Sequence, residues 1–321
     1  MDLMKNLEGF VGENLDLLTP VEQAWQPTDF LPDLTASDWS EQMARFRTTA
    51  MAIPDELLVV LVGNMVTEEA LPNYSVSLSN IVPDPSGVAT DNWSQWLRGW
   101  TSEENRHGDL LNAYLRLTGR VDMRSVERTI HHLIRNGFNS NYQGDPCAGL
   151  IYAAFQERAT RVSHGNVAKL AGQSGDENLA RICRKIASEE TRHETFYTRV
   201  VGQAMDQDPE NAVLAFRSML RGIVAMPGRR MFDGKDPDLY DHFAVVAQRL
   251  GVHTVTSYAQ IIQHLIETWG VAHRSLTGKA AKAQDYLCKQ AERYTFFADE
   301  IAENLARQPH VEFSWIHGVR A

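Results

Sequence analysis

The motif Glu-x-x-His occurs twice in this sequence, and both copies lie in long segments whose hydrophobic periodicity is helical. The first copy runs from Glu104 to His107 and the second from Glu190 to His193. Residues three apart on a helix share a face, so each copy presents a carboxylate and an imidazole side by side. A single copy is more often part of a charged surface face, but the repetition indicates a shared interior site.

A further glutamate stands on the helical segment before each motif. Glu68 lies 36 residues before Glu104, and Glu157 lies 33 residues before Glu190. A helix with one glutamate followed by a helix with Glu-x-x-His, repeated once, is the arrangement that holds two iron or manganese ions in ferritin-like bundles. The sequence therefore predicts an all-α chain with a ferritin-like four-helix-bundle core around a dinuclear metal site.

Charge favours two hard cations at this site. The four glutamates contribute four negative charges, which two divalent cations neutralise, whereas carboxylates without metal are costly in one interior. Oxygen and imidazole ligands suit iron first and manganese second, rather than zinc. Helix spacing does not choose between Glu68 and its neighbour Glu69. Glu103 and Glu189 are either surface charges or hydrogen-bond acceptors for the histidine of the opposite motif.

Cap and breaker signals predict about nine to eleven helices in a single domain, residues 1–321. Gly119 is the expected left-handed residue after one long helix. An apolar run that begins LLVVLVGNMV could be a buried strand, but its length favours a buried helix. The four long core helices are expected at about 55–81, 92–118, 147–173 and 176–205, and the C-terminal helices and tail at 238–321.

Composition excludes several classes of function. Of the 321 residues, 43% are hydrophobic and 22% are charged, which is a globular profile rather than a disordered one. The net charge of −10 argues against a nucleic-acid partner. The sequence has no run of about 18 apolar residues, so membrane insertion is not expected. Three cysteines suit a reducing compartment. The N-terminus lacks a leader-like pattern, so we expect a bacterial cytoplasmic protein, or a protein of the plastid stroma if a plant leader was trimmed.

Around the two motifs the chain reads EENRHGDLLN and SEETRHE. With these blocks the sequence resembles the soluble acyl-acyl-carrier-protein desaturases of the stearoyl type. Similar blocks follow in the order of that family along nearly the whole chain. They include WQPTDFLPD (25–33), TEEALPNY (67–74), FQERAT (155–160), SHGN (163–166) and FSWI (313–316).

This resemblance implies a metal site, a reaction and partners. It makes Glu68 rather than Glu69 a ligand, in the set Glu68, Glu104, His107, Glu157, Glu190 and His193. It implies two iron ions per chain, which use O2 and two electrons from reduced ferredoxin to introduce a cis double bond into a 16:0 or 18:0 chain on acyl carrier protein. A donor outside the chain also agrees with the absence of a nucleotide-binding fingerprint. A homodimer is implied as well.

The resemblance assigns further roles beside the metals. Thr160 matches a family threonine on the oxygen-binding side, although its hydroxyl could simply bond to a helix carbonyl. Trp25, His107 and Glu189 match the electron path proposed for the family, although Trp25 could be a loop aromatic packed on the bundle. Six positions match the wall of the substrate channel or are ordinary core. They are Ser77, Asn80, Ile81, Gly149, Leu150 and Tyr152.

Three other functions fit the same bundle. A ferritin-like iron oxidase or storage protein would take up more than two metals per chain, but it gives no purpose to the block at 25–33. The radical-generating subunit of ribonucleotide reductase needs a tyrosine near the metals, for which Tyr114, Tyr152 and Tyr197 are candidates. A di-iron acyl hydroxylase would keep the fold and cofactor and change only the product.

Overall fold

The computed structural model describes residues 3–140, 142, 144–221 and 224–316. Within these ranges the chain forms twelve α-helices and five short 3-10 helices, and the only β-type pairing is an isolated bridge between Val121 and Ile316. The all-α prediction is confirmed. The helices slightly outnumber the expectation because a short helix, α1 (Leu3–Gly12), precedes the bundle and one expected long helix is divided in two.

Three of the long core helices begin at an aspartate whose side chain accepts a hydrogen bond from a backbone N–H of the first turn. They are Asp91 before α5 (Asn92–Thr118), Asp145 before α7 (Pro146–Gln173) and Asp176 before α8 (Glu177–Gln207). These caps satisfy N–H groups that the start of a helix leaves without partners. α5 ends at Gly119, whose φ of 70° is the left-handed conformation expected there.

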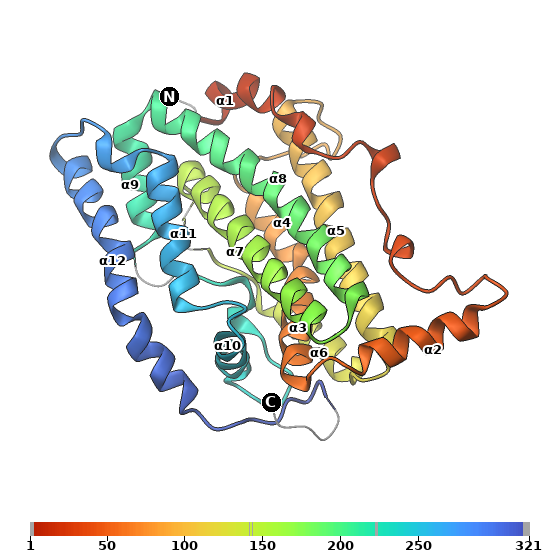
Figure 1. Ribbon diagram of the computed structural model, residues 1–321. Coiled ribbons are helices and arrows are strands. Elements are labelled where there is room, and N and C mark those ends of the chain that lie inside the picture. Colours follow the sequence, from red (N-terminus) through yellow and green to blue (C-terminus); the bar gives the residue numbers. More distant parts are fainter. Residues whose placement is uncertain (1–2, 141, 143, 222–223, 317–321) are drawn as a thin grey trace.

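The core helices pack in two pairs. α7 lies along α8, and α3 (Asp55–Glu68) lies along α5. Figure 1 shows α5, α7 and α8 running side by side, with α3 and α4 (Leu71–Ser79) beside them. This arrangement brings the four segments that carry the predicted ligands around one interior.

The expected continuous helix over 55–81 is wrong in one respect, because it breaks between α3 and α4. Glu69 and Ala70 separate the two helices, and Pro72 follows in the first turn of α4. Proline has no backbone N–H, so Pro72 cannot donate the helical hydrogen bond to the carbonyl of Glu68, and its ring crowds that carbonyl. Glu68 is therefore the last residue of α3 rather than a residue inside a long helix.

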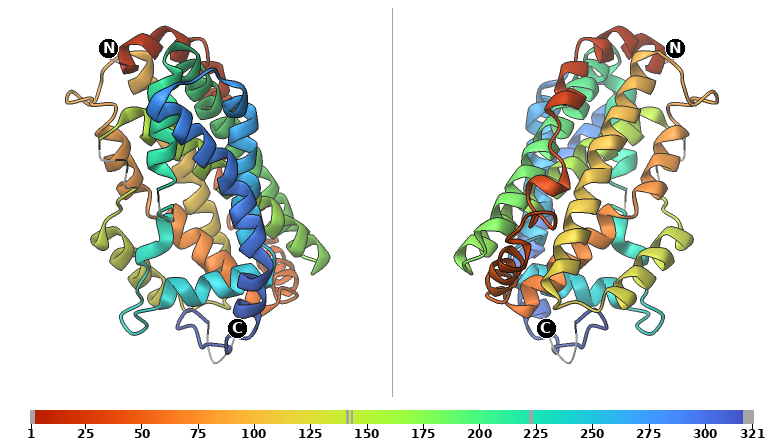
Figure 2. Two further views of the ribbon diagram at one scale, coloured as in Figure 1. Left: turned by 90° about the vertical axis from the view of Figure 1, so that its left-hand side faces the viewer. Right: turned by 90° about the vertical axis from the view of Figure 1, so that its right-hand side faces the viewer.

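The remaining helices cover the bundle. They are α2 (Trp39–Ala50), α6 (Met123–Asn136), α9 (Pro209–Met219), α10 (Leu239–Arg249), α11 (Val255–Thr268) and α12 (Gly278–Ala306). Figure 2 shows α11 and α12 on one side of the bundle and the N-terminal segment on the opposite side. The C-terminal tail returns to α6, where the buried Trp315 donates its indole N–H to Thr129 at 2.9 Å.

No single described helix has both the length and the apolar character needed to cross a membrane. A bent pair, Trp39–Ala50 with Asp55–Ser79, meets those criteria only when both parts are counted together.

The contact between α3 and α10 depends on a glycine. A Cβ atom at Gly63 would lie 2.1 Å from Cε2 of Phe243. We expect Gly63→Ala to lower the free energy of unfolding by about 1–3 kcal/mol, because the ring of Phe243 must leave its packed position.

Gly165 on α7 has open space around it and is the matched control. Gly165→Ala should leave the stability unchanged or raise it by up to about 1 kcal/mol. Urea denaturation of both variants measures this, and equal effects would contradict it.

Candidate metal centre

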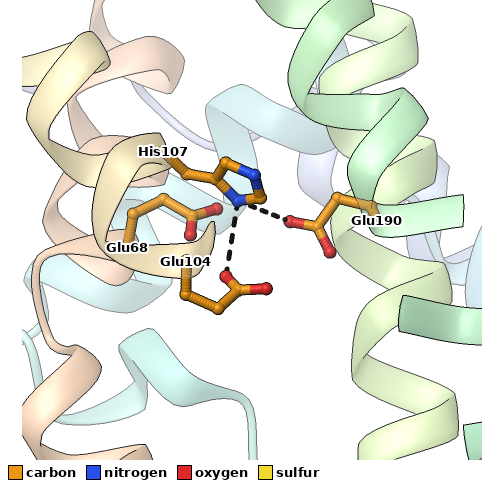
Figure 3. Close-up of side chains that lie close together, drawn as sticks. All are labelled: Glu68, Glu104, His107 and Glu190. Atoms are coloured by element: carbon orange, nitrogen blue, oxygen red, sulfur yellow. Dashed lines mark ion pairs between the residues drawn. The ribbon is translucent and has the colours of Figure 1, made fainter. Parts of the chain in front are cut away.

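The two motifs and the two preceding glutamates form one buried cluster. Their ligand-type atoms make two groups, and within each group the atoms lie within 4.8 Å of one another. One group is Glu68, Glu104, His107 and Glu190 (Figure 3), and the other is Glu104, Glu157, Glu190 and His193. Glu104 and Glu190 belong to both groups, so the cluster has two halves that share two carboxylates.

Helix packing places these side chains without a loop. Glu104 and Glu190 lie in the interior of α5 and α8, Glu157 in the interior of α7, and Glu68 at the end of α3. Gly108 lets α5 approach the end of α3, because a Cβ there would lie only 3.3 Å from the backbone nitrogen of Glu69. The glycine after the first motif therefore permits the helix contact that brings Glu68 to His107.

Both histidines turn Nδ1 toward the cluster. Nδ1 of His107 lies 3.4 Å from Glu104 and 3.4 Å from Glu190. Nδ1 of His193 lies 2.7 Å from Glu104 and 3.5 Å from Glu157. In each imidazole, Nδ1 thus faces two carboxylates, and it makes no hydrogen bond with a described residue.

The outer nitrogens contact the two glutamates that precede the motifs. Nε2 of His107 lies 3.0 Å from Glu189 on α8, and Nε2 of His193 lies 2.8 Å from Glu103 on α5. Glu189 is fully buried and Glu103 is 3% exposed, so neither is a surface charge. The sequence left two interpretations of Glu103 and Glu189 open, surface charges or hydrogen-bond acceptors. The geometry agrees with acceptors, each of which fixes the imidazole ring of the opposite motif.

Two arginines and the N-terminal segment balance these outer carboxylates. Arg106 and Arg192 lie 3.3 and 3.0 Å from Glu189, and both also contact Glu103. The backbone N–H of Thr19 donates to Glu103 at 2.7 Å. The outer layer therefore pairs two negative with two positive charges, and these two arginines contact the outer carboxylates rather than the four inner ones.

The pKa shifts show how the cluster behaves without metal. Burial raises the pKa of Glu157 and of Glu68, and neighbouring carboxylates add to the effect. Burial opposes ionisation of His107 and His193, but the carboxylates around them outweigh it and raise the pKa of both rings. For Glu189 burial is likewise outweighed, by the hydrogen bond from His107 and then by the charges of His107 and Arg106, and its pKa falls to about 2. Protons thus neutralise the inner cluster when no cation does.

The donor atoms fit a pair of metal ions. Nδ1 of His107, Nδ1 of His193, one oxygen of Glu104 and both oxygens of Glu190 are buried and make no hydrogen bond with any described residue. Such atoms usually cost about 1–3 kcal/mol each. Even the 2.7 Å approach of His193 to Glu104 lacks hydrogen-bond geometry. Two divalent cations would give these atoms partners and neutralise the four inner carboxylates.

Glu69, the rival of Glu68 in the sequence, turns away from the cluster. Its side chain accepts a hydrogen bond from Asn112 at 2.9 Å. It belongs to neither group of ligand-type atoms. The geometry therefore agrees with Glu68 as the residue that faces the centre.

Sequence reasoning missed two residues that hold the end carboxylates. The indole N–H of Trp100 donates to Oε1 of Glu157 at 3.0 Å, and Nε2 of His164 lies 2.9 Å from Oε1 of Glu68. Trp100 stands one helical turn before Glu104, and His164 stands two turns after Glu157. Both spacings put the residue on the face of its helix that carries the ligand, which is the signal that could have found them.

Trp25 lies beside a histidine of the cluster, and Thr160 lies beside the inner carboxylates. The ring of Trp25 is stacked on His107 with centroids 6.2 Å apart, and the guanidinium of Arg106 lies over it at 5.2 Å. The hydroxyl of Thr160 donates to the carbonyls of Gln156 and Glu157, as a helical threonine commonly does, and the residue also lines the cavity beside the cluster. The intrahelical bond leaves the oxygen lone pairs of Thr160 available to the cavity.

A cavity opens from the inner carboxylates and runs between α4 and α7. We call it the main cavity. Its walls include Glu68, Glu104, Glu157, Glu190, Trp100, Thr160, Tyr74, Ser77, Phe138, Tyr142, Gly149 and Tyr152. Gly149 stands eight residues before Glu157, which is about 12 Å along α7. At that level the hydroxyls of Ser77 and Tyr142 lie 2.6 Å apart. The main cavity thus begins at the inner carboxylates and has a hydroxyl pair in its wall further along.

Three of the six expected channel positions line this cavity and three do not. Ser77, Gly149 and Tyr152 are in the wall, whereas Asn80, Ile81 and Leu150 are not. Asn80 is exposed at the C-terminal cap of α4. Ile81 fills the space beside Gly149 from behind, and Leu150 is buried in the core.

Comparisons with known proteins agree with this geometry. The family model described as fatty acid desaturase matches residues 1–317, so the chain belongs to the fatty acid desaturase family and is an oxidoreductase. It is 47% identical to stearoyl-[acyl-carrier-protein] 9-desaturase of Spinacia oleracea over 98% of this chain and 80% of that protein. It is 48% identical to acyl-[acyl-carrier-protein] desaturase of Cucumis sativus, over 98% and 81%.

A solved structure shares the fold. The X-ray structure of the acyl-ACP desaturase DesA2 from Mycobacterium tuberculosis superposes with a TM-score of 0.52 at 21% identity, over 88% of this chain and 98% of that one. At that identity the likeness concerns the fold.

The raised pKa values predict how the metal-free protein responds to pH. Glu68, Glu157, His107 and His193 bind protons more tightly in the folded chain, so the stability that they provide is present below their ordinary values of 4.5 and 6.5 and is lost as pH rises. Groups with lowered pKa values act in the opposite direction. The carboxylates do so below about pH 5, and His253 and His264, whose pKa values are lowered by burial, do so below about pH 7.

We therefore expect the free energy of unfolding in EDTA to fall by about 1 kcal/mol or more between pH 7 and pH 9. Urea denaturation at both pH values measures the fall. Glu157→Gln removes one of the groups and should show a smaller fall. A stability that stays level or rises over this range would contradict the assignment of protons to the cluster.

Proposed function

We propose that this chain is an acyl-acyl-carrier-protein desaturase that introduces a cis double bond into a saturated fatty acyl chain. The observation that carries the proposal is the main cavity, which is mostly apolar and aromatic and starts at the four inner carboxylates. The names of the plant relatives support the same substrate class. An apolar cavity beside the metal ligands serves no purpose in a storage protein for iron.

Two iron ions would be held by Glu68, Glu104, His107, Glu157, Glu190 and His193, with Glu104 and Glu190 shared between them. When bound, they supply the oxidising power that no side chain has, by activating O2. The overall reaction consumes O2, two electrons and two protons, and it converts a CH2–CH2 unit into CH=CH with release of two water molecules.

The residues of the chain position the substrate. The main cavity excludes water and fixes one pair of carbons beside the inner carboxylates, which is the positioning that a flexible chain requires. Thr160 offers its hydroxyl oxygen to the cavity next to Glu157, where it can hold or pass a proton. The stacked Trp25 and His107, with Glu189 behind the ring, offer the electrons a route from the surface.

The partners follow from the chemistry. Reduced ferredoxin is the electron donor that we propose, and acyl carrier protein brings the acyl chain. We further propose a single catalytic domain over the whole chain and a homodimer. The compartment that we propose, because it would supply acyl carrier protein and reduced ferredoxin, is a bacterial cytoplasm or a plastid stroma.

The direct test is product analysis. Iron-loaded protein is incubated with 16:0 and 18:0 acyl carrier protein, O2, ferredoxin, ferredoxin reductase and NADPH, and the fatty acids are analysed by mass spectrometry. We expect a monounsaturated product, a loss of about 100-fold or more in Glu68→Ala, and a smaller change in the matched control Glu69→Ala. A hydroxylated product would identify an acyl hydroxylase instead, and metal uptake beyond two per chain would favour iron storage.

The hydroxyl pair in the wall of the main cavity leads to a prediction of chain-length preference. We propose that Tyr142 and Ser77, whose hydroxyls lie 2.6 Å apart, limit the depth to which an acyl chain enters. Tyr142→Ala removes the ring and should shift turnover toward longer acyl chains by about tenfold, which corresponds to one or two methylene groups of burial. Tyr142→Phe keeps the ring and is the control that should retain the original preference. Competition between 16:0 and 18:0 substrates measures the ratio, and an unchanged ratio in Tyr142→Ala would place the end of the acyl chain elsewhere.

A further inference from the structure

The two halves of the cluster are held by unlike donors. Glu157 accepts a hydrogen bond from the indole of Trp100, and Glu68 lies 2.9 Å from the imidazole Nε2 of His164. Both contacts reach the carboxylate from a different helix. Apart from them the halves are near copies, since each has one glutamate, one Glu-x-x-His and one outer acceptor for the histidine.

The halves also differ in the helices that carry their end carboxylates. Glu157 lies in the interior of α7, with intact helical turns on both sides. Glu68 is the last residue of α3, and Pro72 cannot extend the hydrogen bonding beyond it. The backbone of Glu68 is therefore held less firmly by its own helix, and its carboxylate depends more on contacts from other helices.

His164 provides such a contact to the carboxylate of Glu68. It is 1% exposed, and its Nε2 can serve as the donor to Glu68 only with its proton on that nitrogen. Nδ1 makes no hydrogen bond with a described residue, and it is buried. His164 lines a second cavity, which shares Thr67, Glu68 and Thr160 with the main cavity. Glu68 and His164 both line this second cavity, and the contact with the imidazole limits the directions that the carboxylate can take there.

We propose that His164 is the positioning residue of the half formed by Glu68 and His107, and that this half takes its metal second and with lower affinity than the half formed by Glu157 and His193. The inference rests on the metal centre proposed above. In one half, a neutral indole holds a carboxylate in the interior of a helix and prepares the site in advance. In the other half, an imidazole holds a carboxylate that stands at a helix end. Outer partners of this kind typically change metal affinity by about 10–100-fold.

The test is a titration of the metal-free protein with Co2+, followed by visible absorption and by equilibrium dialysis. For the unchanged chain we expect two ions in two distinguishable steps. His164→Phe should weaken the second step by about 10–100-fold and change the first by less than about threefold. His164→Gln, whose amide can donate to Glu68 from a similar position, should restore the second step to within about threefold.

Trp100→Phe is the matched control, because it removes the donor of the other half. It should weaken the first step and so bring the two steps closer together. Equal weakening of both steps by His164→Phe, no weakening in that variant, or two identical sites in the unchanged chain would overturn the role of His164. Failure of the unchanged chain to bind Co2+ would overturn the metal centre itself, a result distinct from these. His164→Gln keeps the test valid if the Phe variant does not fold.

Discussion

The rest of this structure depends on four carboxylates that are enclosed by one helical bundle. Their mutual repulsion and their loss of solvation have to be offset, and the imidazoles of His107 and His193 lie among them. Without metal the offset comes from protons, as the raised pKa values of Glu68, Glu157, His107 and His193 indicate. Two divalent cations would offset the same charge and would give partners to buried atoms that make no hydrogen bond with a described residue.

The layers outside the cluster follow from this constraint. The histidines hold their orientation because Glu189 and Glu103 receive their outer nitrogens, and those two glutamates are in turn paired with arginines. The N-terminal segment completes this layer through Thr19 and Trp25. The N-terminal segment, which crosses the outside of the bundle, therefore covers the histidine side of the cluster. The main cavity lies on the carboxylate side.

The helical repeat was sufficient for the architecture and for five of the six clustered residues, whereas the choice of Glu68 over Glu69 came from the family resemblance. Glu-x-x-His spacing and cap signals depend on neighbours along the chain, which a sequence displays directly. Pro72 indicated the break after Glu68, but the apolar run before it favoured one continuous helix. Asn80 was expected in the channel wall, but it lies at the C-terminal cap of α4, where it is exposed. The contacts of Trp100 and His164 with the end carboxylates depend on the packing between helices, which spacing along one helix suggests but does not determine.

The central claim is that the buried cluster is a dinuclear metal centre with two shared carboxylates. Anomalous diffraction at the iron absorption edge from crystals of the iron-loaded protein tests it most directly. The account predicts two peaks per chain, one between Glu68 and His107 and one between Glu157 and His193, with Glu104 and Glu190 contacting both. A single peak, or iron bound away from these six residues, would contradict it.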